Sequence, residues 1–162
     1  MPLSSREIYG RLYNPPPDGR RQVIAMSRID AEQLPPLPGV AVISIIAPEK
    51  VEAVLGEFSH ILRLSFADVD FLSKKISSRS AKKLQGAFTR DQAMVVKSFV
   101  ETLPSDIATI VVHCEGGFSR SCAIAVALNK LYGYEVDQKQ LADANPSVVK
   151  TMLEVGLKMG EN

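Results

Sequence analysis

The chain has 162 residues, of which 46% are hydrophobic, and a formal net charge of +1. This length and apolar fraction exclude a disordered chain and indicate a single domain, 1–162, that can bury a core without disulfides. The small net charge excludes a general affinity for nucleic acid or anionic membranes, and no apolar run is long enough to cross a bilayer.

Charges lie near the N-terminus, where a signal peptide needs an apolar stretch, so we expect a cytoplasmic protein whose cysteines are reduced. The two His and two Cys residues have no paired ligand spacing, and we therefore expect no metal and no cofactor.

Apolar runs, caps and turn residues predict alternating strands and helices. Residues 1–20 are expected to be an irregular segment, because "NPPPDG" at 14–19 combines donor-free prolines with a turn dipeptide. The pattern then predicts, in chain order, a strand at 21–27, a helix at 27–34, a strand at 40–46, a helix at 48–58, a strand at 60–66, a helix at 89–103, a strand at 108–114, and helices at 119–133, 137–144 and 147–159. This alternation indicates an α/β fold, with a mostly parallel central sheet of four to five strands covered by helices on both faces.

A basic insertion is expected at 71–88. Six cations and no acidic residue occur between 71 and 90: Lys74, Lys75, Arg79, Lys82, Lys83 and Arg90. Two interpretations stay open for this stretch, a solvated insertion without contacts or a mobile flap that draws in anionic substrates.

The most informative motif is "HCEGGFSRS" at 113–121. A predicted strand ends at Cys114 and a helix begins near Arg120. The turn between them consists of Glu115, Gly116, Gly117, Phe118 and Ser119. Such a strand–turn–helix gathers backbone N–H groups at a helix N-terminus, which favours a bound anion and a thiolate. Arg120 adds a planar fork that fits two phosphate oxygens. A nucleophile beside an anion site predicts thiolate attack on phosphorus and a phosphocysteine intermediate.

The motif resembles the signature loop of the cysteine-dependent protein tyrosine phosphatases, His-Cys-x-x-Gly-x-x-Arg-Ser. It is most similar to the compact dual-specificity branch and its bacterial or phage-type relatives. The residues that match are His113, Cys114, Gly117, Arg120 and Ser121. A weaker likeness extends from about residue 40 to 152.

This resemblance implies a role for each matching residue. Cys114 would be the nucleophile, Arg120 the phosphate clamp and Ser121 a hydrogen-bond donor to the sulfur, while His113 would orient the loop. A general acid is also required, and Asp68 fits that role better than Asp70. Phosphate, sulfate or vanadate would bind inside the loop.

Two further residues carry open interpretations. Asn145 resembles an asparagine that the family uses near the loop, but "NP" is also an ordinary turn before a helix. Cys122 is either core filler or a partner for an oxidised Cys114.

The expected substrate is a phosphorylated protein or a small phosphomonoester, with tyrosine or dual specificity. The alternatives are phosphoinositide or RNA 5′-phosphate hydrolysis, a non-catalytic phosphate-binding module, and sulfur transfer of the rhodanese type. Glu115 would repel a highly anionic substrate if it faced the pocket, and the spacing of Arg120 disfavours sulfur transfer.

Overall fold

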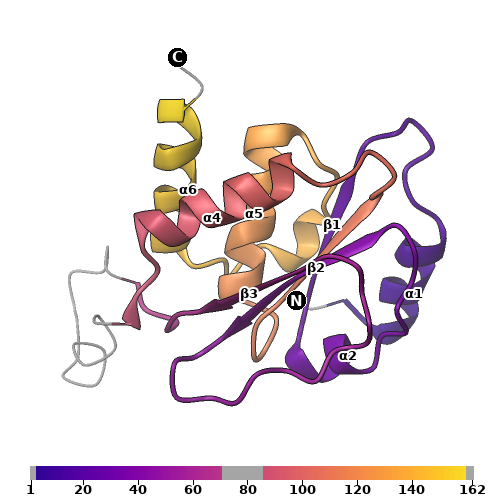
Figure 1. The fold of residues 1–162 in the computed structure, drawn as a ribbon, viewed down its shortest axis with the longest axis horizontal. Helices are drawn as coiled ribbons and strands as arrows, with labels where there is room; N and C mark the ends of the chain where they lie inside the picture. Colours follow the sequence, from indigo (N-terminus) through magenta and orange to yellow (C-terminus); the bar gives the residue numbers. More distant parts are fainter. Residues whose placement is uncertain (1–2, 71–85, 160–162) are drawn as a thin grey trace.

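A four-stranded, all-parallel sheet forms the centre of the molecule (Figure 1). The structure is a computed structural model that describes residues 3–70 and 86–159. The strands are β1 (Gln22–Met26), β2 (Val40–Ile46), β3 (Ile61–Ser65) and β4 (Thr109–His113), in the order β1-β4-β2-β3. The α/β prediction is therefore confirmed. Most of the basic insertion, 71–85, lies outside the described residues.

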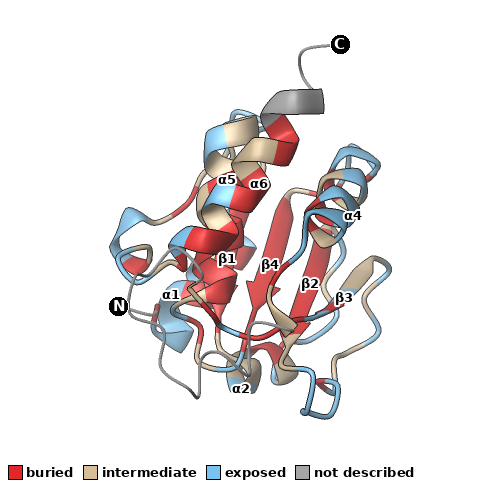
Figure 2. Ribbon diagram, turned by 90° about the vertical axis from the view of Figure 1, so that its left-hand side faces the viewer, coloured by how far each residue is buried: buried red, intermediate tan, exposed pale blue. Residues whose placement is uncertain are grey.

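Helices cover both faces of this sheet (Figures 1 and 2). One face is covered by α4 (Arg90–Glu101), α5 (Arg120–Tyr132) and α6 (Pro146–Met159). The other is covered by α1 (Ser5–Tyr13), α2 (Arg28–Glu32) and part of the chain between 33 and 58. None of the described helices combines the length and apolarity that crossing a bilayer requires.

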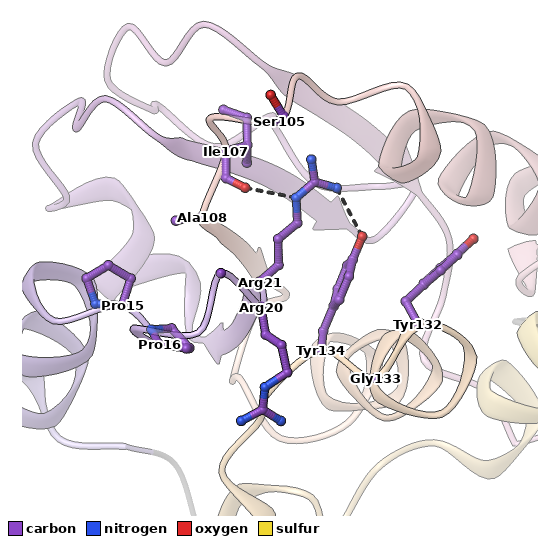
Figure 3. A pocket seen from close by; sticks show the side chains of 11 residues that line it. Pro15, Pro16, Arg20, Arg21, Ser105, Ile107, Ala108, Tyr132, Gly133 and Tyr134 are labelled. Atoms are coloured by element: carbon purple, nitrogen blue, oxygen red, sulfur yellow. Dashed lines mark hydrogen bonds between the residues drawn. The ribbon is translucent and has the colours of Figure 1, made fainter.

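Arg21 ties several elements together at the amino-terminal edge of the sheet, just before β1. Its guanidinium donates to the Ile107 carbonyl at 2.8 Å and to the Tyr134 hydroxyl at 3.0 Å (Figure 3). It also reaches three carbonyls at the end of α4 and just beyond it, those of Val100, Leu103 and Pro104. Arg21 thus supplies partners to carbonyls that a helix end leaves open. A cavity of about 630 Å³ borders it, formed in part by Arg20 and Tyr132.

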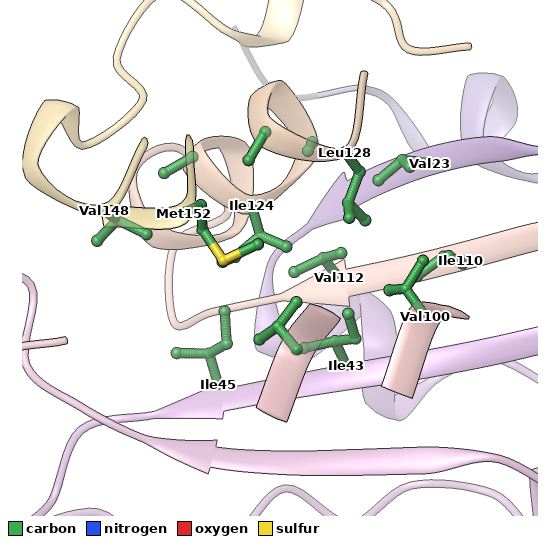
Figure 4. Close-up of a cluster of buried hydrophobic side chains, with 14 of the residues drawn as sticks. Val23, Ile43, Ile45, Val100, Ile110, Val112, Ile124, Leu128, Val148 and Met152 are labelled. Atoms are coloured by element: carbon green, nitrogen blue, oxygen red, sulfur yellow. The ribbon is translucent and has the colours of Figure 1, made fainter. Parts of the chain in front are cut away.

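Two hydrophobic clusters lie on either side of the sheet, and the strand period of two divides the residues between them. On the α4–α5–α6 side, Ile43, Ile45 and Val112 meet Ile124, Leu128 and Met152 (Figure 4). On the α1–α2 side, Ile24, Met26, Val42 and Val111 meet Ile8 and Leu12. Strands buried on both faces need apolar residues at successive positions, which explains the continuous run at 40–46.

The N-terminal segment is helical between Ser5 and Tyr13, and the prediction of an irregular 1–20 is wrong there. Ser4 forms a capping box with Glu7, because each side chain accepts from the other residue's backbone N–H at 3.2 Å. Ile8 and Leu12, four residues apart, bury the same face of α1 against the sheet.

The helix predicted at 48–58 is also wrong, since 51–58 take no regular secondary structure. Side chains from elsewhere bind the backbone groups that a helix would pair internally. The Glu52 carbonyl accepts from Arg28 at 3.0 Å, the Ala53 carbonyl accepts from Arg63 at 3.1 Å, and the Val54 N–H donates to Glu32 at 2.7 Å.

Only part of the helix predicted at 137–144 forms, as the short 3₁₀-helix η2 (Gln138–Gln140). The Asp137 carboxylate accepts from the Lys139 N–H at 2.9 Å and pairs with Arg11 at 2.7 Å. These contacts favour a single capped turn, and the chain turns again before Pro146 begins α6.

Candidate active site

The carboxyl ends of the parallel strands bring the predicted site residues to one edge of the sheet. We call residues 114–120 the cysteine loop; it follows β4 and leads directly into α5. Asp68 follows the edge strand β3, and Lys50 lies in the turn after β2, which is the strand between β3 and β4. The fold therefore gathers residues that are far apart in the sequence.

The backbone of the cysteine loop is oriented by its surroundings. Four of its carbonyls accept hydrogen bonds from outside the turn: Cys114 from His113, Glu115 from the Arg28 N–H, Gly117 from Cys122, and Ser119 from the N–H groups of Ala123 and Asn145. In a trans peptide the N–H points opposite to the preceding carbonyl. The N–H groups that follow these carbonyls therefore point away from the partners of those carbonyls, an arrangement suited to binding an anion.

Gly117 is required at the point where this loop meets β1. Its φ is +83°, and a Cβ there would lie 2.7 Å from the Met26 carbonyl carbon and from the Ser27 nitrogen. Only glycine combines this backbone conformation with so close an approach.

Two hydrogen-bonding groups contact the Cys114 sulfur. The Gly117 N–H donates to Sγ at 3.3 Å, and the Ser121 hydroxyl lies 3.2 Å from it. Cys114 is buried. Each contact places a group that can donate a hydrogen bond within reach of the sulfur.

His113 contacts the backbone of the cysteine loop and is completely buried. Its Nδ1 lies 3.1 Å from the Cys114 carbonyl, which can only accept, so Nδ1 carries the proton. Burial lowers the pKa of His113 below its usual value, and the ring is neutral. Nε2 then accepts from the Ser44 hydroxyl at 2.6 Å.

Arg120 is buried and is one of the residues that line a small cavity of about 180 Å³. Its Nη1 donates to the Phe66 carbonyl at 3.0 Å, which fixes the side chain against the end of β3. Its Nε, however, has no hydrogen-bond partner within residues 3–70 and 86–159. A buried charged donor without an acceptor is costly, and an anion in this cavity would offer acceptors to the guanidinium that lines it.

Asp68 lines the same cavity and is joined to the cysteine loop. Its Oδ1 accepts from the Ser119 hydroxyl at 2.8 Å and from the Asn145 amide at 2.9 Å. Asp70 instead accepts from the Ser147 hydroxyl at 2.7 Å at the start of α6. The two candidate carboxylates thus have different surroundings, and Asp68 is the one beside Arg120.

Asn145 combines the two interpretations that the sequence left open. Its Oδ1 accepts from the N–H groups of Ser147 and Val148, at 3.0 and 3.3 Å, which caps α6. Its amide nitrogen also binds the Val69 carbonyl at 3.0 Å beside Asp68. A turn residue therefore also links the Asp68 segment to the loop.

Cys122 lies behind the cysteine loop, completely buried. Its Sγ is 3.3 Å from the Gly117 carbonyl and 3.0 Å from the Gln140 carbonyl. Burial raises the pKa of Cys122 to about 12, so it is a thiol at neutral pH. Both cysteines are free.

The structure thus brings together four of the predicted site residues, Cys114, Arg120, Ser121 and Asp68. Sequence reasoning missed Ser44, the Phe66 carbonyl and the side-chain contact of Ser119. Ser44 alone had a visible signal, as the one polar residue inside the apolar run of β2. Within the described parts of the chain, no group of three or more His, Cys, Asp or Glu side chains is placed to hold a metal ion.

No family model matches the chain, and no curated protein sequence matches it. Among solved structures, two crystal structures of PTPMT1 are similar to it. The one in complex with PI(5)P is 16% identical, with a TM-score of 0.45, over 75% of this chain and 80% of that one. The other is 15% identical, with a TM-score of 0.46, over 88% of this chain and 96% of that one. The assignment of the site rests on the cysteine loop and its contacts.

Proposed function

We propose that the chain is a protein tyrosine phosphatase-like phosphomonoester hydrolase, with tyrosine or dual specificity, that works in the cytoplasm through a phosphocysteine intermediate. One observation carries the proposal. The buried Arg120 guanidinium leaves its Nε without an acceptor among the described residues, beside a loop in which the Gly117 N–H donates to the Cys114 sulfur. This combination suits a tetrahedral anion held directly in front of a nucleophile.

In the first step, the phosphate oxygens of the substrate accept hydrogen bonds from Arg120 and from the loop N–H groups. The Cys114 thiolate attacks phosphorus, so that an S–P bond forms as the P–O bond to the leaving group breaks. Asp68, protonated in this step, donates its proton to the leaving oxygen. Its place in the cavity beside Arg120 supports this role.

In the second step, water attacks the phosphocysteine and the S–P bond breaks. The Asp68 carboxylate takes a proton from that water, which restores the acid for the next cycle. The Ser121 hydroxyl, 3.2 Å from Sγ, donates to the departing thiolate. The products are inorganic phosphate and the free enzyme.

The test is hydrolysis of a generic aryl phosphate by the wild type and by Cys114→Ser. We expect turnover by the wild type alone, inhibition by vanadate, and a phosphorylated Cys114 in acid-quenched wild-type samples. Cys114→Ser should still bind vanadate, because Arg120 and the loop N–H groups remain. Vanadate binding without turnover by the wild type would contradict the proposal and favour a non-catalytic phosphate-binding module.

A further inference from the structure

The cavity beside Arg120 is lined by more carboxylates than cations. Its charged lining residues are Glu49, Lys50, Asp68, Glu115 and Arg120. Once Arg120 is paired with a substrate phosphate and Asp68 serves as the acid, two carboxylates and one ammonium remain there. Any second anion on the substrate would therefore meet net negative charge among the described residues.

Glu115 is the carboxylate best placed to repel a second anion on the substrate. It belongs to the cysteine loop itself, is exposed, and has only one ion-pair partner among the described residues, Arg28 at 3.8 Å. Arg28 is also 3.5 Å from Glu32, so its charge is shared between two acids. Arg28 therefore neutralises the Glu115 carboxylate only in part, and Glu115 still repels an anion that approaches the cavity.

Exposed apolar side chains occur in the cysteine loop and next to Lys50 and Arg28 in the chain. Phe118 in the cysteine loop is 47% exposed, and its ring lies so close to Gly116 that a Cβ there would be 2.5 Å from a ring carbon. Val51, next to the lining residue Lys50, is 80% exposed, and Ile29, next to Arg28, is 67% exposed. Exposed apolar residues in the segments that form a pocket offer contact surface to a bound partner.

We infer that the substrate class of this site is a phosphopeptide segment with apolar residues beside the phosphorylated residue and no acidic neighbour, and that Glu115 is the residue that rejects a second anion. The inference rests on the proposed function. A phosphopeptide suits the charges around this cavity better than a phosphoinositide in a bilayer does. The headgroup of such a lipid carries a phosphodiester beside the monoester, and its surface is anionic, so both would face Glu115 and Glu49.

Three phosphotyrosyl peptides of equal length test this, with Val, Ser or Glu on both sides of the phosphotyrosine. At about 0.05 M NaCl we expect kcat/KM to fall in the order Val, Ser, Glu, with roughly tenfold between Val and Glu. Glu115→Gln should lower the Ser/Glu ratio by about threefold, a loss of discrimination that about 0.5 M NaCl should also produce in the wild type. Glu57→Gln, which removes an equal charge elsewhere on the surface, should leave that ratio unchanged.

A separate substitution tests the inferred preference for apolar residues beside the phosphotyrosine. Val51→Ser should lower the Val/Ser ratio by about twofold without changing the Ser/Glu ratio, because only apolar contact is lost. Each ratio compares substrates within one variant, so a general loss of activity does not affect it.

Three results would overturn the inference. Equal kcat/KM for the three peptides, with intact aryl phosphate hydrolysis, would overturn it and leave the proposed function standing. Faster hydrolysis of a phosphoinositide in phosphatidylcholine vesicles than of the Val peptide would assign a lipid substrate instead. Loss of all hydrolysis, including that of the aryl phosphate, would overturn the proposed function as well.

Discussion

The neutral ring of His113 connects the nucleophile to the interior of the sheet. Its Nδ1–H holds the Cys114 carbonyl, and its Nε2 accepts from Ser44 on the neighbouring strand β2. Protonation of Nε2 would turn that acceptor into a donor and would place a charge in the core. The native state therefore resists protonation of this residue.

This resistance predicts a loss of stability in mild acid. The native pKa of His113 is lowered by burial, whereas the unfolded value is about 6.5, so the unfolded chain binds more protons as pH falls below about 6.5. The free energy of unfolding should then decrease by up to about 1.4 kcal/mol per pH unit in that range. Urea unfolding of the wild type and of His113→Gln at about pH 7.5 and 5.5 measures the slope, which the substitution should flatten.

His60→Gln is the matched control, since it removes the only other histidine of the chain, which is partly exposed. That variant should keep the wild-type slope. Equal slopes for the wild type and His113→Gln would show that another group causes the acid sensitivity.

The choice between Asp68 and Asp70 also belongs to single residues. Asp68→Asn should lower kcat by roughly 100-fold for an alkyl-like leaving group and by less than about fivefold for an activated phenol, because only a poor leaving group needs the proton. Asp70→Asn should have no such dependence, since Asp70 binds Ser147 at the start of α6. A series of aryl phosphates of graded leaving-group pKa measures both variants. A steeper dependence for Asp70→Asn would transfer the role to Asp70.

The turn between β4 and α5 requires glycine at position 117. Gly117→Ala should abolish measurable activity and lower the free energy of unfolding by more than about 3 kcal/mol, because it adds a clash with β1 to the cost of positive φ. Gly19→Ala separates the two effects. Gly19 has a similar φ of +81° but open space around its Cβ direction, so only the conformational cost of about 1 kcal/mol applies.

Urea unfolding and aryl phosphate hydrolysis measure both glycine variants. Similar losses of stability in the two would show that the loop can move away from Met26, and that the close approach is unimportant.

The sequence predicted elements whose signals are local. The run at 40–46 and the cap at Thr89 gave β2 and α4, because strand burial and capping depend on neighbouring residues. The stretch at 48–58 has a helical composition, but Arg28, Glu32 and Arg63 bind its backbone from elsewhere in the fold. Tertiary contacts override local preference at such a place.

The same distinction applies to the candidate site. Cys114, Gly117, Arg120 and Ser121 follow from one short motif, because a strand–turn–helix fixes their relation. The Phe66 carbonyl that holds Arg120 lies 54 residues away in the chain, and that contact depends on how β3 joins the sheet. Only the fold could show it.

At the scale of the whole molecule, one edge of the sheet carries the candidate active site and the other carries a set of stabilising contacts. The carboxyl edge carries the cysteine loop, whereas Arg21 binds groups at the amino edge (Figure 3). The Arg21 guanidinium connects β1 to the end of α4, to the start of β4 and to Tyr134 after α5. Stability and chemistry should therefore be separable by substitutions at the amino edge.

Arg21→Lys tests this separation. A lysine ammonium offers three donors from one point and cannot span the acceptors that the planar guanidinium reaches. The free energy of unfolding should fall by about 2–3 kcal/mol, since partly buried hydrogen bonds from a charged group are lost. Arg20→Lys is the control, because the exposed Arg20 pairs with the adjacent Asp18, and its urea midpoint should match that of the wild type. At a temperature where all three proteins are folded, kcat/KM for an aryl phosphate should be equal. A lower kcat/KM for folded Arg21→Lys would instead show that the amino edge is coupled to the cysteine loop through α5 and β4.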